Sequence, residues 1–333
     1  MLILSQDDVV RLLPMSACIE VMSSTLATLA RGDALLPLRT VILIPNTNDA
    51  FAVMPAYIGS PKTMGAKIIT VYPENHGTEL DSHQGAVLLF DARNGSLAAL
   101  LDATAVTTIR TAAVSAVATR LLAREDASRL TIIGSGVQAY AHLESMCAVR
   151  DITSLRVWSR SSEHARALVD VARDKFELDA EVSPTGADAV RDAHIVCTTT
   201  SARTPVLEGA WLTPGTHINA IGASQRTARE VDSAAVVRSR LYVDRRESAL
   251  KEPGDILVPL EDGDIGPDHI VAEIGELLIG RGEGRRNAND VTLFKSLGLA
   301  VEDLASALYA YTEAKRTGVG VEVEVGGTRN VAH

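Results

Sequence analysis

The chain has 333 residues, 46% hydrophobic and 22% charged, which is typical of a folded globular protein with room for two domains. Its net charge of −10 argues against nucleic acid or an anionic membrane as a partner. The sequence has neither a basic leader nor an apolar run of about 18 residues, so we expect a cytoplasmic protein without membrane spans. Cys18, Cys147 and Cys197 occur singly in apolar surroundings, and we therefore predict no metal site.

The N-terminal part is predicted to begin with two helices and to continue as a sheet. Residues 5–31 show helical periodicity, with Ser5 and Asp8 spaced as a capping box and Gly32 at the helix end. Apolar runs bounded by turn residues follow, and Asn94–Gly95 is typical of a hairpin turn. The expected strands of this antiparallel or mixed sheet are 38–44, 50–54, 65–72, 85–91 and 96–101.

A glycine-rich turn between a strand and a helix marks the second half of the chain. The apolar run 130–133 breaks into Gly134-x-Gly136-x-x-Ala139, and a helix-compatible segment follows. In a Rossmann fold these residues allow a tight turn, close approach of a pyrophosphate and close packing of the helix on the strand. A chance glycine-rich turn is the alternative, but the strand and helix on either side favour a dinucleotide site.

Strands and helices alternate along the rest of this half, which predicts an α/β fold with a doubly wound parallel Rossmann sheet. We expect helices at 103–122 and 299–317, the second packing back on the N-terminal part. The predicted Rossmann domain is therefore 123–299. The second predicted domain is α+β and discontinuous, and it is made of 1–122 and 300–333.

The second strand of this half ends in Ser159–Arg160–Ser161, where proteins that bind NAD usually carry an acidic residue. A carboxylate would accept the ribose hydroxyls, whereas a guanidinium between two hydroxyls suits a 2′-phosphate. We therefore predict NADP(H) as the preferred cofactor, with NAD(H) possible. The alternative is a solvated surface arginine.

Three cations lie in apolar stretches ahead of the glycine turn: Arg39, Lys67 and Arg110. A charge in such surroundings is costly unless it is paired. Each one alone is explained as well by a solvated residue or a structural ion pair. Together they suit a carboxylate substrate, since arginines bind carboxylates bidentately and a partly desolvated lysine can transfer a proton.

Several motifs together resemble the ornithine cyclodeaminase/μ-crystallin family along essentially the whole chain. They are Gly65–Ile68, Ser82–Gly85, Ile109–Ala113, Gly134–Ala139, Ile221–Ser224 and Lys295–Gly298. The resemblance implies a homodimer in which each subunit joins a substrate and dimerisation domain to a Rossmann domain. It also implies that Arg39, Lys67 and Arg110 bind the substrate, and we assign Lys67 as the catalytic residue. As a desolvated charge, Lys67 is expected to be replaceable by Met without loss of thermal stability.

The predicted cofactor contacts come from the glycine turn, the end of the second strand and further positions that the resemblance implies. They are Ser82, His83, Thr111, Gly134, Gly136, Val137, Gln138, Ala139, Ser159, Arg160, Ser161, Thr198, Ser224 and Ser296.

Two departures from the family pattern decide the predicted reaction. Ser224 stands where the resemblance leads us to expect the aspartate of cyclodeaminases and family alanine dehydrogenases, and Ala52 is nearest to the position of a cyclodeaminase glutamate. We therefore predict an NADPH-dependent reductase of a cyclic imino acid, such as Δ1-pyrroline-2-carboxylate or Δ1-piperideine-2-carboxylate. The alternatives are an ornithine cyclodeaminase or alanine-type dehydrogenase using NAD, and a non-catalytic binding protein controlled by NADPH.

Overall fold

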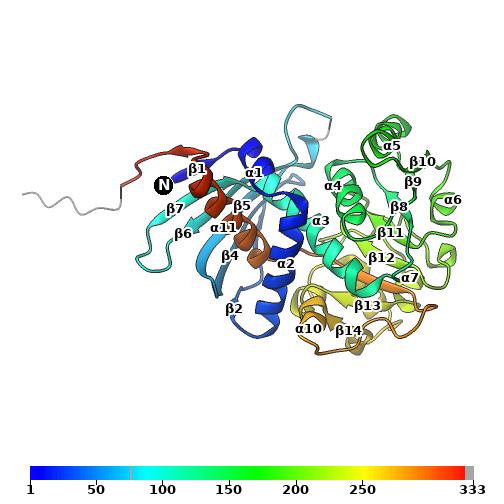
Figure 1. Cartoon of the computed structure of the whole chain (residues 1–333). Coiled ribbons are helices and arrows are strands. Elements are labelled where there is room, and N and C mark those ends of the chain that lie inside the picture. The colour runs from blue at the N-terminus through cyan, green and yellow to red at the C-terminus, as the bar shows by residue number, and fades with distance from the viewer. Residues whose placement is uncertain (76, 327–333) are drawn as a thin grey trace, which may run out of the picture. The chain divides into compact units, whose positions relative to one another are not determined.

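A computed structural model describes residues 1–75 and 77–326 of the chain (Figure 1). The chain divides into two units, the first made of Met1–Arg110 with the segment from Leu299 onward, and the second of Thr111–Gly298. Helix α3 (Ala103–Leu122) runs through the boundary between them. The predicted boundary at residue 122 lies at the end of this helix, whereas the contacts place the boundary within it.

The first unit begins with helices α1 (Gln6–Leu12) and α2 (Met15–Ala30). Ser5 caps α1 as predicted: its hydroxyl accepts from the Asp8 amide at 3.3 Å, and Asp8 Oδ2 accepts from the Ser5 amide at 3.1 Å. Among the described residues no single helix has the length and apolar character of a membrane span. Of the described helices, only α1 and α2 taken together have this length and apolar character, and they are bent by 81° at their junction.

The sheet of the first unit contains every strand predicted from the sequence, together with three short ones that were not. Its strands are β1 (Leu2–Leu4), β2 (Ala34–Leu35), β3 (Thr40–Leu43), β4 (Ala50–Gly59), β5 (Lys62–Val71), β6 (His83–Phe90), β7 (Leu97–Asp102) and β16 (Val321–Glu322). Their order is β16-β1-β7-β6-β5-β4-β2, with β3 also paired to β4. The β1–β7 pair is parallel and the other pairs are antiparallel, so the sheet is mixed as predicted.

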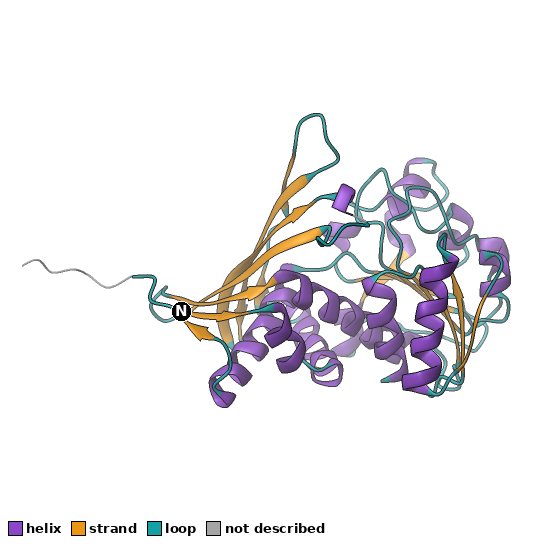
Figure 2. Ribbon diagram, turned by 90° about the horizontal axis from the view of Figure 1, so that it is seen from above, coloured by secondary structure: helices purple, strands orange, loops and turns teal. Residues whose placement is uncertain are grey.

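One face of this sheet is covered by helices (Figures 1 and 2). Along β4 every second residue is buried, which is the pattern of a strand with one covered face. Helix α11 (Ala300–Thr317) packs on β4, β5 and β6 and also against α2. The C-terminal segment of the chain therefore completes the core of the first unit.

The second unit is a doubly wound α/β fold, as predicted. Its strands are β8 (Arg129–Ile133), β9 (Ser154–Trp158), β10 (Asp179–Val182), β11 (Ile195–Thr198), β12 (His217–Ala220), β13 (Arg240–Val243), β14 (Ile270–Glu273) and β15 (Thr292–Lys295). They form a parallel sheet in the order β10-β9-β8-β11-β12-β15-β13-β14. The direction of winding reverses between β8 and β11, and in such sheets ligands bind at the carboxyl ends of the strands beside this point.

The helices of the second unit connect these strands. They are α4 (Val137–Cys147), α5 (Ser162–Phe176), α6 (Gly186–Val190), α7 (Ser233–Val237), α8 (Arg246–Ala249), α9 (Gly254–Glu261) and α10 (Ile274–Leu278). The central strands β11, β12 and β15 are buried at every residue, because a parallel sheet of this kind is covered on both faces.

Candidate active site

A buried cluster of four charged side chains lies where α11 meets β5 in the first unit. Lys67 Nζ lies 2.7 Å from Asp303 Oδ2, and Arg110 Nε donates to Asp303 Oδ1 at 2.8 Å. Arg110 Nη1 donates to Glu302 Oε2 at 3.1 Å. The Lys67 and Arg110 side chains are 2% and 5% exposed, and both carboxylates are 0% exposed. Two of the three predicted substrate cations therefore meet on one carboxylate.

The register of the sheet turns Lys67 toward α11. Lys67 pairs with Met54 of β4 and Val87 of β6, both of which are buried. Since directly paired residues of antiparallel strands point to the same face, Lys67 lies on the covered face. Gly65 allows α11 to approach closely, because a Cβ added there would lie 2.8 Å from Leu304 Cδ1.

Burial makes Lys67 unusually acidic. Removal from water lowers the pKa of Lys67 to about 8, even though Asp303 opposes the shift, and the charges of Arg110 and Arg39 lower it further. Burial alone would raise the pKa of Asp303, but attraction to Arg110 and Lys67 outweighs burial and holds that pKa below its ordinary value. Lys67 can therefore release and regain a proton near neutral pH while Asp303 stays ionised.

Arg110 is part of a structural ion-pair network, the alternative that the sequence left open. Its Nε and Nη1 atoms are engaged by Asp303 and Glu302, which lie next to each other at the start of α11. A substrate carboxylate that contacts Arg110 would therefore have to share it with these two carboxylates. Carboxylates in the first turn of a helix are also stabilised by the helix dipole.

Arg39 supplies a third positive charge near Lys67, but not from a strand. It is half-buried and lies one residue before β3, whereas the sequence placed it within a strand. Its charge contributes to the lowered pKa of Lys67, so the two side chains share one electrostatic environment.

The glycine turn of the second unit has the geometry that a dinucleotide requires. Gly134 follows β8 with a φ of 121°, and a Cβ added to it would lie 2.6 Å from Thr199 Oγ1. Gly136 is the N-cap residue of α4, and no side-chain hydrogen bond caps this helix. A Cβ at Gly136 would meet nothing within 4 Å, so the space in front of the helix is open to a phosphate. Ala139 is fully buried, as close packing of the helix on the strand predicts.

The end of β9 lies beside this turn. Ser135 Oγ is 2.7 Å from Ser159 Oγ, and either hydroxyl can be the donor. Ser161 caps α5, since its hydroxyl accepts from the His164 amide at 3.2 Å. Arg160 lies between the two serines and is exposed. Val137 and Gln138 begin α4. These residues can thus surround the phosphates and ribose of a dinucleotide that binds at the helix N-terminus.

The predicted cofactor residues on α3 and at the start of β6 contact polar groups of the chain itself. Thr111 is buried on α3, where its carbonyl accepts from Ser115 Oγ at 3.3 Å. Ser82 Oγ lies 3.1 Å from His83 Nδ1, and the His83 carbonyl accepts from Thr104 Oγ1 at 2.7 Å. Thr111, Ser82 and His83 remain predicted cofactor contacts.

Thr198 is engaged by Glu230, a buried carboxylate that the sequence did not indicate. Glu230 Oε2 accepts from Thr198 Oγ1 at 2.8 Å and from the Gly222 amide at 2.5 Å. Its Oε1 accepts from the Thr200 amide and hydroxyl at 2.6 and 2.7 Å. Glu230 thus ties together the chain segments that follow β11 and β12. Ser224, two residues beyond Gly222, is exposed.

A second buried ion pair supports Glu230. Lys295 Nζ lies 3.0 Å from Asp255 Oδ2 with both side chains almost fully buried, and Asp255 Oδ1 accepts from the Glu230 amide at 2.8 Å. Burial raises the pKa of Glu230, while the charge of Lys295 opposes that change. Ser296 is buried directly after Lys295, and its amide donates to the Ala220 carbonyl at 3.0 Å. We interpret this network as support for the strand ends rather than as a substrate site.

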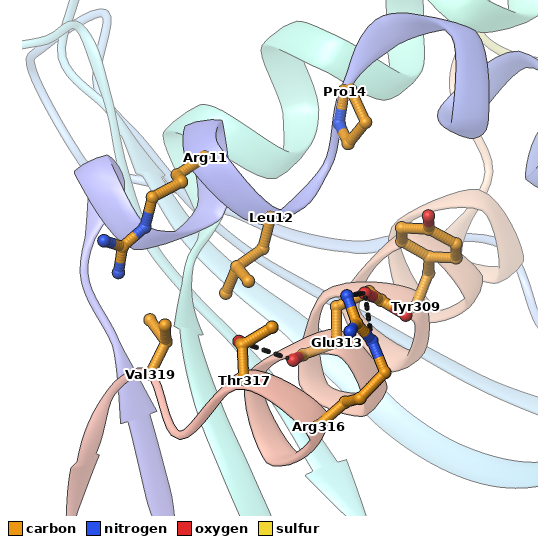
Figure 3. A pocket seen from close by; sticks show the side chains of 8 residues that line it. All are labelled: Arg11, Leu12, Pro14, Tyr309, Glu313, Arg316, Thr317 and Val319. Atoms are coloured by element: carbon orange, nitrogen blue, oxygen red, sulfur yellow. Dashed lines mark hydrogen bonds and ion pairs between the residues drawn. The ribbon is translucent and has the colours of Figure 1, made fainter.

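A surface pocket of about 380 Å³ lies on the first unit, and none of the four residues of the charged cluster lines it (Figure 3). It is lined by Arg11, Leu12, Pro14, Tyr309, Glu313, Arg316, Thr317 and Val319, none of which is a predicted site residue. Its arginines are paired locally, Arg11 with Asp8 and Arg316 with Glu313. Among residues 1–75 and 77–326, no group of three or more His, Cys, Asp or Glu side chains is placed to hold a metal ion.

Comparison with known proteins identifies the family of the chain. A sequence profile of the ornithine cyclodeaminase/mu-crystallin family matches residues 1–318. The chain belongs to this family. It is 40% identical to the ketimine reductase mu-crystallin of Mus musculus over 280 residues, which cover 84% of this chain and 85% of that protein. It is 36% identical to the Δ1-pyrroline-2-carboxylate reductase of Bacillus cereus over 325 residues, which cover 97% and 100% of the two chains.

A solved structure of the same family matches the whole fold. It is the Thermococcus litoralis Δ1-pyrroline-2-carboxylate reductase in complex with NADH and L-proline. Its TM-score is 0.95 at 38% identity, with 97% of this chain and 100% of that chain covered. The resemblance inferred from the motifs and the predicted fold class are both confirmed.

Proposed function

We propose that the protein is an NAD(P)H-dependent reductase of small cyclic imino acids, with Δ1-pyrroline-2-carboxylate and Δ1-piperideine-2-carboxylate as the substrate class. The observation that carries this proposal is the buried Lys67, whose pKa of about 8 suits a proton donor, in the same cluster as Arg110. The family relatives of this chain include proteins named as reductases of a ketimine and of Δ1-pyrroline-2-carboxylate.

The cluster carries the positively charged side chains that a carboxylate substrate needs. Lys67 and Arg110 meet on Asp303, and the charge of Arg39 acts on Lys67. Arginine and lysine side chains are common partners of a substrate carboxylate.

Lys67 donates the proton in the proposed reaction. Its ammonium hydrogen-bonds the imine nitrogen and makes the adjacent carbon electrophilic. The nicotinamide, when bound, supplies the hydride that this carbon receives. As the C=N π bond breaks, the nitrogen keeps the proton from Lys67, and the neutral amine of Lys67 is protonated again from solvent.

The glycine turn and the end of β9 are the proposed cofactor site. Gly134, Gly136 and the amides at the start of α4 hold the pyrophosphate, and Arg160 pairs with the 2′-phosphate of NADP(H). This assignment makes NADPH the preferred cofactor. Arg160→Asp should reverse the preference, because it replaces charged hydrogen bonds worth about 1.5–3 kcal/mol each with repulsion. Equal Kd values of the wild type for NADPH and NADH would contradict this assignment.

The alternative functions differ in what they consume and release. A cyclodeaminase would release ammonia from ornithine, and an alanine-type dehydrogenase would reduce NAD with alanine. The exposed Ser224, in place of the expected aspartate, disfavours both. A protein that only binds NADPH would oxidise it with none of the imines.

An initial-rate panel separates these functions. NADPH or NADH consumption is followed with the two cyclic imines and a dicarboxylic imine, and ammonia and NADH formation are followed with ornithine and alanine. We expect turnover with the cyclic imines and formation of the saturated amino acid. Ammonia release from ornithine, or no turnover with any imine, would contradict the proposal.

A further inference from the structure

Asp303 contacts both the proton donor and one of the arginines of the proposed substrate site. We propose that Asp303 is a positioning residue for imine reduction. Its carboxylate keeps Lys67 charged and aimed, and the same carboxylate fixes Arg110, so that proton donation and carboxylate binding depend on one shared counter-ion. This inference rests on the proposed function and adds a residue that neither the sequence motifs nor the substrate chemistry indicated.

The two oxygens of Asp303 serve different partners. Oδ2 lies 2.7 Å from Lys67 Nζ, and Oδ1 accepts from Arg110 Nε at 2.8 Å. The Asp303 side chain has 0% exposure, so its position is set by packing rather than by solvent. The next residue of α11, Leu304, packs against Gly65 of β5, which fixes the helix on the strand that carries Lys67.

The other charges around Lys67 cannot replace Asp303. Lys67 Nζ also donates to Thr107 Oγ1 at 3.3 Å, but a hydroxyl has no charge to balance the ammonium. The titratable groups that surround this cluster are Asp303 and Glu302 on α11, Arg110 on α3, Arg39 before β3 and Cys18 on α2. Arg39 and Arg110 both favour the neutral amine of Lys67. If the charge of Asp303 is removed, the ammonium loses its contacting anion and keeps both repulsive neighbours.

Glu302 is the matched control, because it lies next to Asp303 with the same burial. It accepts from Arg110 Nη1 at 3.1 Å and from the Leu299 amide at 3.0 Å, and no contact with Lys67 is seen among the described residues. Asp303→Asn removes the carboxylate charge that contacts both Lys67 and Arg110. Glu302→Gln removes a carboxylate charge that contacts Arg110. Both substitutions keep the shape of the side chain.

The first measurement is the ionisation of Lys67 itself, followed by NMR of the intact protein with lysine labelled at Cε. The lysines are few, namely Lys62, Lys67, Lys175, Lys251, Lys295 and Lys315, and Lys67→Met identifies the signal. We expect the midpoint of Lys67 in Asp303→Asn to lie about 1 to 3 pH units below that of the wild type. In Glu302→Gln the midpoint should stay close to the wild-type value. This readout needs no turnover, so it stands even if the proposed substrate is wrong.

The second measurement separates kcat from KM with Δ1-pyrroline-2-carboxylate and NADPH. Asp303→Asn should lower kcat at pH 7.5 by between about threefold and several hundredfold, and activity should recover as the pH is lowered through the new midpoint of Lys67. Glu302→Gln should raise KM and weaken L-proline binding in calorimetry, with little change in kcat or in its pH profile.

Asp303→Glu keeps the carboxylate charge and provides a second test in case Asp303→Asn does not fold. Asp303→Glu should retain a Lys67 midpoint near that of the wild type and keep more activity than Asp303→Asn, although its side chain is larger. An unchanged Lys67 midpoint in folded Asp303→Asn would overturn the proposal. If Asp303→Asn does not fold, the proposal would be overturned by an Asp303→Glu protein that is folded and inactive with an unchanged Lys67 midpoint.

Discussion

The charge of Lys67 serves the proposed catalysis rather than stability. From the sequence alone, its replacement by Met carries no stability cost. The lowered pKa of Lys67 supports this expectation, because the cost of removing the ammonium from water exceeds the attraction of Asp303. Asp303 keeps its contact with Arg110 when Lys67 is replaced, so Lys67→Met should unfold at the wild-type thermal midpoint or above it near pH 7, as thermal denaturation can check.

The pH dependence of stability tests the buried state of Lys67. Its pKa is about 8 in the folded protein and returns toward 10.5 in the unfolded chain. Between these values the unfolded chain holds a proton that the folded protein lacks, so stability due to Lys67 rises with pH through this window. The free energy of unfolding of the wild type relative to Lys67→Met should therefore grow by about 3 kcal/mol from pH 8 to 10.5. A difference that stays constant across this range, in urea titrations, would mean that Lys67 is not desolvated.

At the scale of elements, the sequence predicted most of what local patterns control. The Ser5 cap, the hairpin at Asn94–Gly95 and the strand-turn-helix at Gly134 all formed as expected, because each depends on residues close together in the chain. The short strands β1, β2 and β16 were missed, since two or three residues carry no periodicity and their pairing is decided by the rest of the sheet.

The glycine turn allows a matched pair of substitutions. Gly134→Ala should destabilise the protein, because the residue has a positive φ and the new Cβ would meet Thr199 at 2.6 Å. Gly136→Ala should leave the thermal midpoint unchanged, since its φ is −87° and its surroundings are open, but it should weaken cofactor binding by filling the phosphate space. Thermal unfolding and NADPH titration of both variants check this. Normal NADPH affinity in Gly136→Ala would remove this turn from the cofactor site.

At the scale of the whole molecule, the sequence could not show which distant residues meet. The cations Lys67 and Arg110 were visible because they interrupt apolar stretches, but their partners Glu302 and Asp303 look like ordinary first-turn residues of a helix. Glu230 and the Lys295–Asp255 pair were missed for the same reason: only the fold brings them together. The sequence still indicated that each cation in an apolar stretch needs a counter-ion, because an unpaired buried charge is costly. It could not identify which residue provides that counter-ion.

We propose that the protein forms a homodimer through the edge of the first-unit sheet at β3. Val41, Ile42 and Leu43 are 45%, 56% and 71% exposed, and an exposed apolar sheet edge of this kind is typical of a surface that another chain covers. Ile42→Lys should therefore shift the protein toward the monomer, whereas Val10→Lys, at an exposed apolar position on α1, should not. Analytical ultracentrifugation of the two variants tests this. A wild-type monomer, or an Ile42→Lys dimer as stable as the wild type, would contradict the proposal.

The initial rate of Δ1-pyrroline-2-carboxylate reduction by NADPH, compared between the wild type and Lys67→Met, tests the proposed mechanism most directly. The wild type should form one L-proline for each NADPH oxidised, with kcat/KM falling as the pH rises above about 8 because Lys67 loses its proton. Lys67→Met should lower kcat by roughly 10²–10⁴, the usual contribution of a general acid, with the Kd for NADPH unchanged. A folded Lys67→Met protein that reduces the imine as fast as the wild type would contradict the account.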